Sequence, residues 1–166
     1  MFRNGDILVI YNPKNNGAVI GTHPFIVVNS EEGNVNGMAY DFAAVVMSSM
    51  TTKEREEKAA KYISNFVIQP EDKKVKETKH VTLNQKPAFA YLNQPFFFSV
   101  EETRVKRIGK MTDEAFEQLI ERMELLKKRH IPMHYVYDNL REKENQVSPE
   151  QLISTDEEER IEEREL

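Results

Sequence analysis

The sequence predicts a mainly β protein with added helices, organised as a small antiparallel barrel. Short apolar runs rich in β-branched residues recur along the chain and are separated by Gly, Pro, Asn and Ser. One strongly amphipathic segment, residues 112–129, predicts a helix that packs on the barrel. A chain of 166 residues with 39% hydrophobic residues suits one domain with additions and a modest core.

Three strands are expected in residues 1–49. Residues 6–11, 25–28 and 42–47 are compact apolar runs of strand length. The second run is entered through a His-Pro step, and the third ends in two serines. The turn cluster of residues 12–17 is followed by another glycine before the second strand, which predicts a connection that can move.

The middle of the chain predicts a short helix followed by a strand. Residues 53–65 are rich in helix formers and carry a weak apolar stripe, with Thr51 or Thr52 as the N-cap. Residues 66–68 predict a strand that stops at a Gln-Pro step. The charged residues 71–77 predict a loop or the tip of a hairpin.

Strand signals resume in the second half of the chain. Residues 80–83, 89–92 and 96–100 each predict a strand, and Pro95 predicts an edge or a bulge before the last of them. The three consecutive phenylalanines at 96–98 are interpreted as core plus a dimer face, with a stacking platform for RNA bases as the alternative. Because a strand with two aromatic faces cannot hide both in a small barrel, this pattern predicts a homodimer.

The helix predicted over residues 112–129 ends the compact part of the chain. Thr112 or Asp113 can cap its start, and basic residues suit its C-terminal end. Beyond it, residues 131–166 are predicted to form an acidic, largely flexible tail. Within that tail, residues 135–137 predict a short contact, and residues 148–150 predict a final helical turn.

The net charge of −5 is unevenly distributed along the chain. Residues 136–166 hold 11 acidic and 4 basic residues, which leaves residues 1–135 close to neutral, at +2. Within that part, four basic residues are bunched between positions 104 and 110. This cluster predicts either phosphate contacts or an ordinary solvated face.

Neither a membrane partner nor a metal centre is expected. No apolar run approaches the ~20 residues needed to span a bilayer, and the N-terminus lacks a signal-peptide pattern. The chain has no cysteine and no Cys/His spacing typical of a metal site. These features predict a cytoplasmic protein without a metal.

The order of these features resembles the MazF/PemK family of toxins from type II toxin–antitoxin systems. The resemblance spans residues 3–129, with an insertion at about residues 51–78. It implies an SH3-like antiparallel barrel of MazF/PemK/CcdB type over residues 1–130, with a packed C-terminal helix, an inserted helix and a two-fold homodimer. The resemblance is carried by Gly5-Asp6, the Gly-bearing loop, His23-Pro24, Ser48-Ser49, and residues 79–83, 89–94 and 103–111.

The resemblance also implies an activity, which is cleavage of single-stranded RNA without metal or cofactor, the 2′-hydroxyl attacking its own phosphodiester. Before the proline of the second strand the family usually has arginine, where this chain has His23. At the end of the third strand threonine is common, and here Ser48 stands beside Ser49. The family's acid and second arginine are missing, because that segment matches residues 93–96, Asn-Gln-Pro-Phe.

These departures leave two interpretations open. Arginine can bind two phosphate oxygens at once, which neutral histidine cannot, but histidine can exchange protons near neutral pH. The first interpretation is a ribonuclease in which His23, Ser48 and Ser49 are catalytic. The second is that His23 only completes a strand entry, and that a phage- or plasmid-encoded chain binds RNA or an acidic antitoxin-like peptide without cutting. The predicted RNA-binding residues are Arg3, Lys14, Asn16, Thr22, Gln94 and Arg104.

A third function class and a further partner remain open. A similar barrel serves toxins that poison gyrase, so the resemblance also allows a topoisomerase-directed inhibitor. Residues 152–159 combine apolar anchors with carboxylates, as acidic antitoxin segments do. The C-terminal tail is therefore expected either to fold back over the RNA groove of a barrel or to act only as a solubilising tail.

Overall fold

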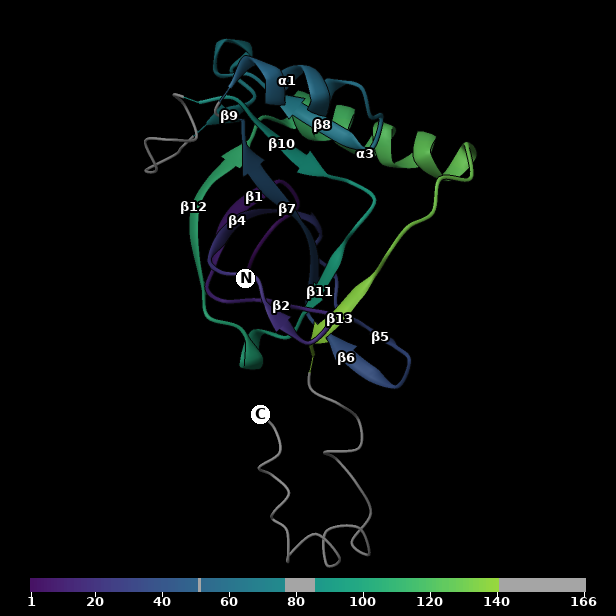
Figure 1. Ribbon diagram of the computed structural model, residues 1–166. Coiled ribbons are helices and arrows are strands. Elements are labelled where there is room, and N and C mark those ends of the chain that lie inside the picture. Colours follow the sequence, from purple (N-terminus) through teal and green to yellow (C-terminus); the bar gives the residue numbers. More distant parts are fainter. Residues whose placement is uncertain (51, 77–85, 141–166) are drawn as a thin grey trace, which may run out of the picture.

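The computed structural model describes residues 1–50, 52–76 and 86–140. They form a strongly curled, mainly antiparallel sheet with α1 (Lys53–Ala60) and α3 (Asp113–Lys128) packed above it (Figure 1). This arrangement confirms the predicted mainly β fold with a curled antiparallel sheet. The sheet contains β1 (Asp6–Ile10), β4 (His23–Asn29), β7 (Phe42–Ser49), β8 (Asn65–Ile68), β9 (Val75–Lys76), β10 (Ala88–Tyr91), β11 (Phe96–Phe98), β12 (Val105–Met111) and β13 (Val136–Asn139).

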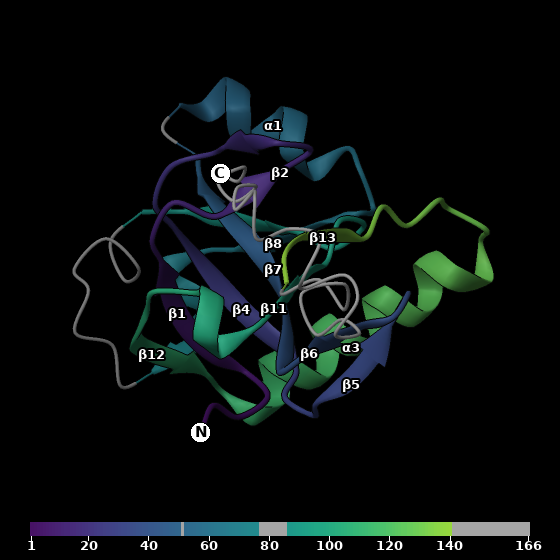
Figure 2. The same ribbon diagram turned by 90° about the horizontal axis from the view of Figure 1, so that it is seen from below.

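The strands follow the order β13-β11-β7-β4-β1-β12-β9, and all neighbours in it are antiparallel except β11 and β13. β10 and β11 share one edge of β7: β11 pairs with its first half and β10 with its last residues. β8 adds to the outer edge of β10. The chain must bend between β10 and β11. Figure 2, a view from below, shows how the sheet curls round on itself.

The curl gives the central strands two buried faces. Along β7, Ala44 and Val46 belong to an inner core within the curl, whereas Val45 and Met47 belong to an outer core under α3. A strand buried on both faces is a continuous apolar run, which explains the absence of alternation in residues 42–47. The inner core contains Leu8, Ile10, Phe25, Val27, Phe42, Ala44, Val46, Phe96, Phe98 and Val136.

Helix α3 begins and ends where the sequence predicts. Thr112 caps it, because its Oγ1 accepts a hydrogen bond from the Ala115 N–H at 3.2 Å. Leu119 and Leu126, two members of its apolar stripe, are fully buried in the outer core. The predicted helix over residues 112–129, packed on the sheet, is therefore confirmed.

Two small hairpins were not predicted, β2 (Lys14–Asn15) with β3 (Ala18–Val19), and β5 (Gly33–Val35) with β6 (Met38–Tyr40). Each has Asn-Gly at its tip. Asn16 and Gly17 have φ values of 54° and 84°, and Asn36 and Gly37 have φ values of 51° and 78°. A two-residue type I′ turn needs positive φ at both positions, which Asn-Gly adopts readily.

The middle of the chain differs from the prediction at two points. Helix α1 ends at Ala60 rather than near residue 65, because Asn65 already pairs with Tyr91 as the first residue of β8. The Asn65 Nδ2 donates to the Ala59 carbonyl at 3.1 Å and so satisfies a carbonyl in the last turn of α1. The charged residues 71–77 are not only a loop, since β9 pairs with β12.

The phenylalanines of β11 point to two faces, and one chain covers both. Phe96 and Phe98 are buried in the inner core. On the other face Phe97 contacts Tyr40 and Tyr137, with ring centroids 4.8 Å and 5.4 Å away. The argument that such a strand requires a dimer is therefore wrong for this fold, and the homodimer remains a prediction.

The sheet extends past residue 130, where the predicted tail begins. Val136 pairs with Phe96 in parallel, and Val136 and Leu140 are buried. Residues 136–140 thus belong to the folded part of the chain, because their apolar side chains complete the core beside β11.

Some predictions fall outside the described residues. They are the strand at 80–83, Thr51 as N-cap, the helical turn at 148–150 and the acidic segment 152–159. Within the described ranges, no helix is both long and apolar enough to cross a membrane.

Asn139 joins β13 to the β2–β3 hairpin. Its Oδ1 accepts from the Lys14 N–H at 2.8 Å, its Nδ2 donates to the Lys14 carbonyl at 3.0 Å, and the Gly17 N–H donates to Asp138 at 2.7 Å.

Asn139→Ala removes the two hydrogen bonds between Asn139 and Lys14, so we expect the free energy of unfolding to fall by about 1–2 kcal/mol. Urea unfolding and amide hydrogen exchange at Lys14 measure the effect. Unchanged exchange there would contradict it, and Asn34→Ala, exposed in β5, is the control.

Candidate functional site

The predicted catalytic residues lie at the beginning of β4 (His23) and at the end of β7 (Ser48 and Ser49). His23 pairs with Ile10 of β1, and the β4–β7 register pairs Phe25 with Val46. Continuing that register by two residues brings His23 opposite Ser48. Directly opposed residues on neighbouring antiparallel strands point to the same face, with Cβ atoms roughly 5 Å apart.

The imidazole of His23 is oriented by the chain that leads into β4. Its Nε2 lies 3.0 Å from the main-chain carbonyl of Ile20, and the ring is partly buried. A carbonyl oxygen only accepts, so Nε2 carries the hydrogen of this bond. In the neutral ring the lone pair is then on Nδ1, the nitrogen able to accept a proton.

The two serines at the end of β7 are not equivalent. Ser48 pairs with Phe89 of β10, and Ser49 pairs with Ala88. Because successive side chains on a strand point to opposite faces, only Ser48 shares the face of His23. By the continued register, only one of the two predicted catalytic hydroxyls, that of Ser48, is on the face of the histidine.

Arg104 lies at the same end of the sheet, next to β1. The Tyr11 N–H donates to the Arg104 carbonyl at 3.0 Å, and the guanidinium carbon lies 4.5 Å from the centroid of the Tyr11 ring. The stacking holds the cation over an aromatic face. Nearby Arg107 instead donates from Nε to the buried Asp6 carboxylate at 3.1 Å, so part of the basic cluster is structural.

The other predicted RNA-binding residues are spread over the fold. Thr22 is next to His23 in the chain, but Lys14 and Asn16 are on the hairpin held against β13. Arg3 is at the far end of β1, where its N–H donates to Asp6 at 2.8 Å. Gln94 lies in the link from β10 to β11, which β7 separates from β4. Apart from Thr22, the fold does not place these residues beside His23, because strand pairing and not residue type decides which side chains are neighbours.

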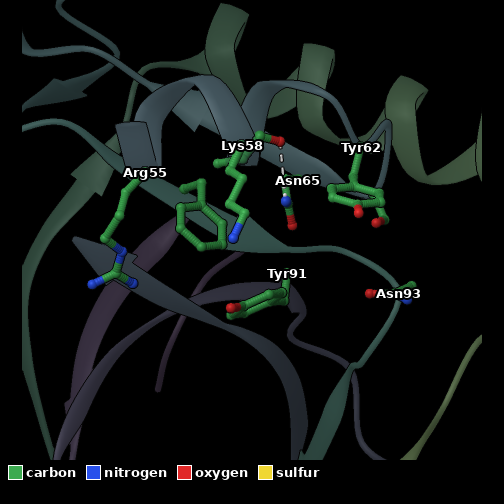
Figure 3. A pocket seen from close by; sticks show the side chains of 9 residues that line it. Arg55, Lys58, Tyr62, Asn65, Tyr91 and Asn93 are labelled. Carbon is green, nitrogen blue, oxygen red and sulfur yellow. Dashed lines mark hydrogen bonds between the residues drawn. The ribbon is translucent and has the colours of Figure 1, made fainter. Parts of the chain in front are cut away.

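His23, Ser48 and Arg104 are called the cluster from here on. Beside it is a pocket of about 390 Å³ between α1 and β10, named here the α1–β10 pocket (Figure 3). Arg55 and Lys58 reach into it from α1, and the ring of Tyr91 forms the opposite wall. Tyr62 and Asn93 stand at its other end. No acidic side chain is among the described residues that line it.

The pocket and the cluster are on one continuous face of the sheet. Phe89 lines the pocket and pairs with Ser48, so both side chains point to the face that also carries His23. Continuing the β4–β7 register to His23 puts Phe89 two strand spacings, about 10 Å, from His23. A single extended ligand can therefore contact both places.

Sequence analysis missed the pocket residues. It treated residues 53–65 as an addition to the fold, and it assigned residues 89–92 only to a strand. Two signals were available: Arg55 and Lys58 are spaced i, i+3 on one helix face, and Tyr91 interrupts an apolar strand with a polar tip.

The cluster combines an imidazole, a hydroxyl and a nearby guanidinium, which suits proton transfer and phosphate binding. In the described parts of the chain, no three His, Asp or Glu side chains gather closely enough to hold a metal ion. No protein-family model matches the chain, and no curated protein matches it.

Proposed function

We propose that this protein is a toxin-like, metal-independent endoribonuclease that acts on single-stranded RNA, on an SH3-like barrel of MazF/PemK type. The observation that carries the proposal is the β4–β7 register, which, continued by two residues, puts His23 and Ser48 on one face, together with Nδ1 of His23 as the basic nitrogen. An imidazole and a hydroxyl side by side suit attack within a phosphodiester, which needs proton transfer and a donor to the phosphate.

In the proposed reaction, Nδ1 of His23 takes the proton of a ribose 2′-hydroxyl. The 2′-oxygen then bonds to the adjacent phosphorus while the bond from phosphorus to the 5′-oxygen breaks. Solvent water protonates the leaving 5′-oxygen, and His23 returns its proton to solvent. The products are a 2′,3′-cyclic phosphate and a 5′-hydroxyl, with no net consumption of water.

The neighbouring groups have supporting roles in this proposal. The hydroxyl of Ser48 donates to a non-bridging phosphate oxygen on the shared face. Arg104, held over Tyr11, provides positive charge along the path of the RNA backbone. A two-fold homodimer and an acidic antitoxin-like partner belong to the same proposal, because the resemblance implies them.

Incubation with a long single-stranded RNA in EDTA tests the reaction class. We expect discrete cuts with cyclic phosphate and 5′-hydroxyl ends, since the nucleophile is part of the substrate. Single-stranded DNA of the same sequence is the control and should stay intact, because it lacks the 2′-hydroxyl. Cleavage of that DNA, or cleavage of RNA only when Mg²⁺ is added, would rule out this mechanism.

One observation favours a second candidate, a binding module that does not cut. The bond from His23 to the Ile20 carbonyl is by itself a reason to have a polar ring at the entry of β4. RNA that is bound by the purified protein at low salt, yet remains intact in EDTA and in Mg²⁺, would favour the binding module.

A further inference from the structure

We propose that the α1–β10 pocket binds one nucleotide of single-stranded RNA, with the base on Tyr91 and the phosphate at Arg55 and Lys58. This inference rests on the proposed RNA substrate, and it assigns a role to the helix in the insertion. The pocket volume of about 390 Å³ lies within the roughly 300–1,000 Å³ typical of small-molecule sites.

The charge of the pocket favours an anionic ligand. Arg55 and Lys58 are one turn apart on α1, and both side chains extend toward β10 (Figure 3). Two acidic residues lie between them in sequence, Glu56 and Glu57, and neither lines the pocket; Glu56 accepts a hydrogen bond from the Gln69 side chain at 3.3 Å. Two cations without a lining carboxylate are the arrangement expected for a phosphate.

The aromatic side chains favour a ligand that is also flat. Tyr91 is 37% exposed although it belongs to a strand, and Tyr62 is 64% exposed. The Tyr91 ring packs against the ring of buried Phe89 in a T-shaped pair, with centroids 4.8 Å apart and planes at 77°, a contact that favours one orientation of Tyr91 before any ligand binds. An oriented, exposed tyrosine face beside two cations is typical of stacking sites for single-stranded nucleic acids.

The amides of the pocket can contact the edge of a base. Asn65 is nearly buried, and its Nδ2 is committed to the Ala59 carbonyl at 3.1 Å. Its amide oxygen therefore points the other way, into the pocket, and the side chain of Asn93 points inward from the opposite end (Figure 3). Such groups hydrogen-bond to the exposed edges of unpaired bases.

The position of the pocket suits a nucleotide that is part of a longer single-stranded RNA. The continued β4–β7 register puts Phe89 and His23 two strand spacings apart, about 10 Å, so a nucleotide on Tyr91 would neighbour the one whose phosphate lies at His23. The helix of the insertion thus extends the RNA-binding face beyond the reacting phosphate.

The test is binding of a labelled RNA of about eight nucleotides, a length suited to a single-strand groove. Its 2′-hydroxyls are methylated so that it cannot be cut, and fluorescence anisotropy is followed in EDTA. We expect Tyr91→Leu to weaken binding about tenfold, as expected when one base loses its stacking partner, whereas Tyr91→Phe keeps the ring and the affinity. Equal affinities of these two variants would overturn the inference.

A second pair of variants tests the phosphate contact. Arg55→Gln with Lys58→Gln should make the dependence of log affinity on log salt shallower by about 0.7, the value for one phosphate contact on a single strand. Lys53→Gln with Lys61→Gln changes the charge of the same helix equally, outside the pocket, and should leave the slope unchanged. Identical slopes in the two double variants would overturn the assignment of the cations.

The same assay separates this inference from the proposed nuclease. Binding of the methylated strand that depends on Tyr91, without cleavage of ordinary RNA, supports the pocket and refutes the nuclease. Cleavage together with equal affinities of Tyr91→Leu and Tyr91→Phe refutes the pocket alone. Adenosine monophosphate should compete weakly, because it fills only the pocket. Competition as strong as that of the unlabelled strand would assign the pocket to a free nucleotide and overturn the RNA assignment.

Discussion

His23→Gln should lower the rate of RNA cleavage in EDTA by at least 10²-fold, within the roughly 10²–10⁴-fold typical of a positioned general base. His23 Nε2 contacts the Ile20 carbonyl at 3.0 Å. The glutamine amide can still donate a hydrogen bond to that carbonyl, so the backbone conformation at the start of β4 should be preserved. It cannot accept the proton of the 2′-hydroxyl. Single-turnover cleavage and RNA affinity, measured side by side, should show a lost rate and an affinity within about threefold of the wild type, or less than 1 kcal/mol.

The serines provide a matched comparison within the same experiment. Ser48→Ala should slow cleavage because Ser48 shares the face of His23, whereas Ser49→Ala should not, since Ser49 points to the opposite face. A His23→Gln protein that cuts at the wild-type rate would remove His23 from the chemistry. Equal effects of the two serine changes would contradict the placement inferred from the strand register.

Phe98→Ala should lower the free energy of unfolding by about 3–5 kcal/mol, as expected for removing a fully buried aromatic side chain. Phe98 has no exposed surface, and its ring contacts Phe25 and Phe42 at centroid distances of 5.3 Å. The change leaves a cavity between β4, β7 and β11, which cannot collapse because the curled sheet encloses it. Urea unfolding followed by circular dichroism measures the loss.

Phe97→Ala is the control for that measurement. Phe97 lies on the outer side of β11, where its ring contacts those of Tyr40, Tyr135 and Tyr137, which can shift into the space that it leaves. Its loss should therefore be clearly smaller than that of Phe98→Ala. A larger effect of Phe97→Ala would mean that the outer face is the main core, and would favour the predicted dimer contact there.

Local patterns in the sequence were sufficient to predict most of the helices and strands. The run at 42–47 and the stripe of 112–129 predicted β7 and α3, because hydrophobic period and capping chemistry are local properties. The Asn-Gly pairs of the two hairpins were equally local signals that sequence analysis passed over. The strand at 136–139 escaped prediction because it is held by β11, far away in sequence.

The candidate site could be predicted only in part. The positions of His23 and Ser48 came from a resemblance, and nothing in the sequence states that they are opposed, or that Ser49 points away. Arg55, Lys58 and Tyr91 gave local signals, but the α1–β10 pocket itself could not be predicted, because α1 and β10 are separate segments that meet when β8 pairs with β10. Arg3 and Gln94 were placed in the site by their types, and the strand order separates them from it.

By itself, the sequence determined the local elements of this protein: the apolar strands, the capped helix and the Asn-Gly turns. Only the tertiary structure decided which strand ends lie together, which faces are buried, and that a helix of the insertion completes a cationic and aromatic pocket. The physical reason is that strand register depends on long-range pairing and on burial of both sheet faces. A side chain gains its neighbours from the opposite strand, and the local pattern carries no information about which strand that is.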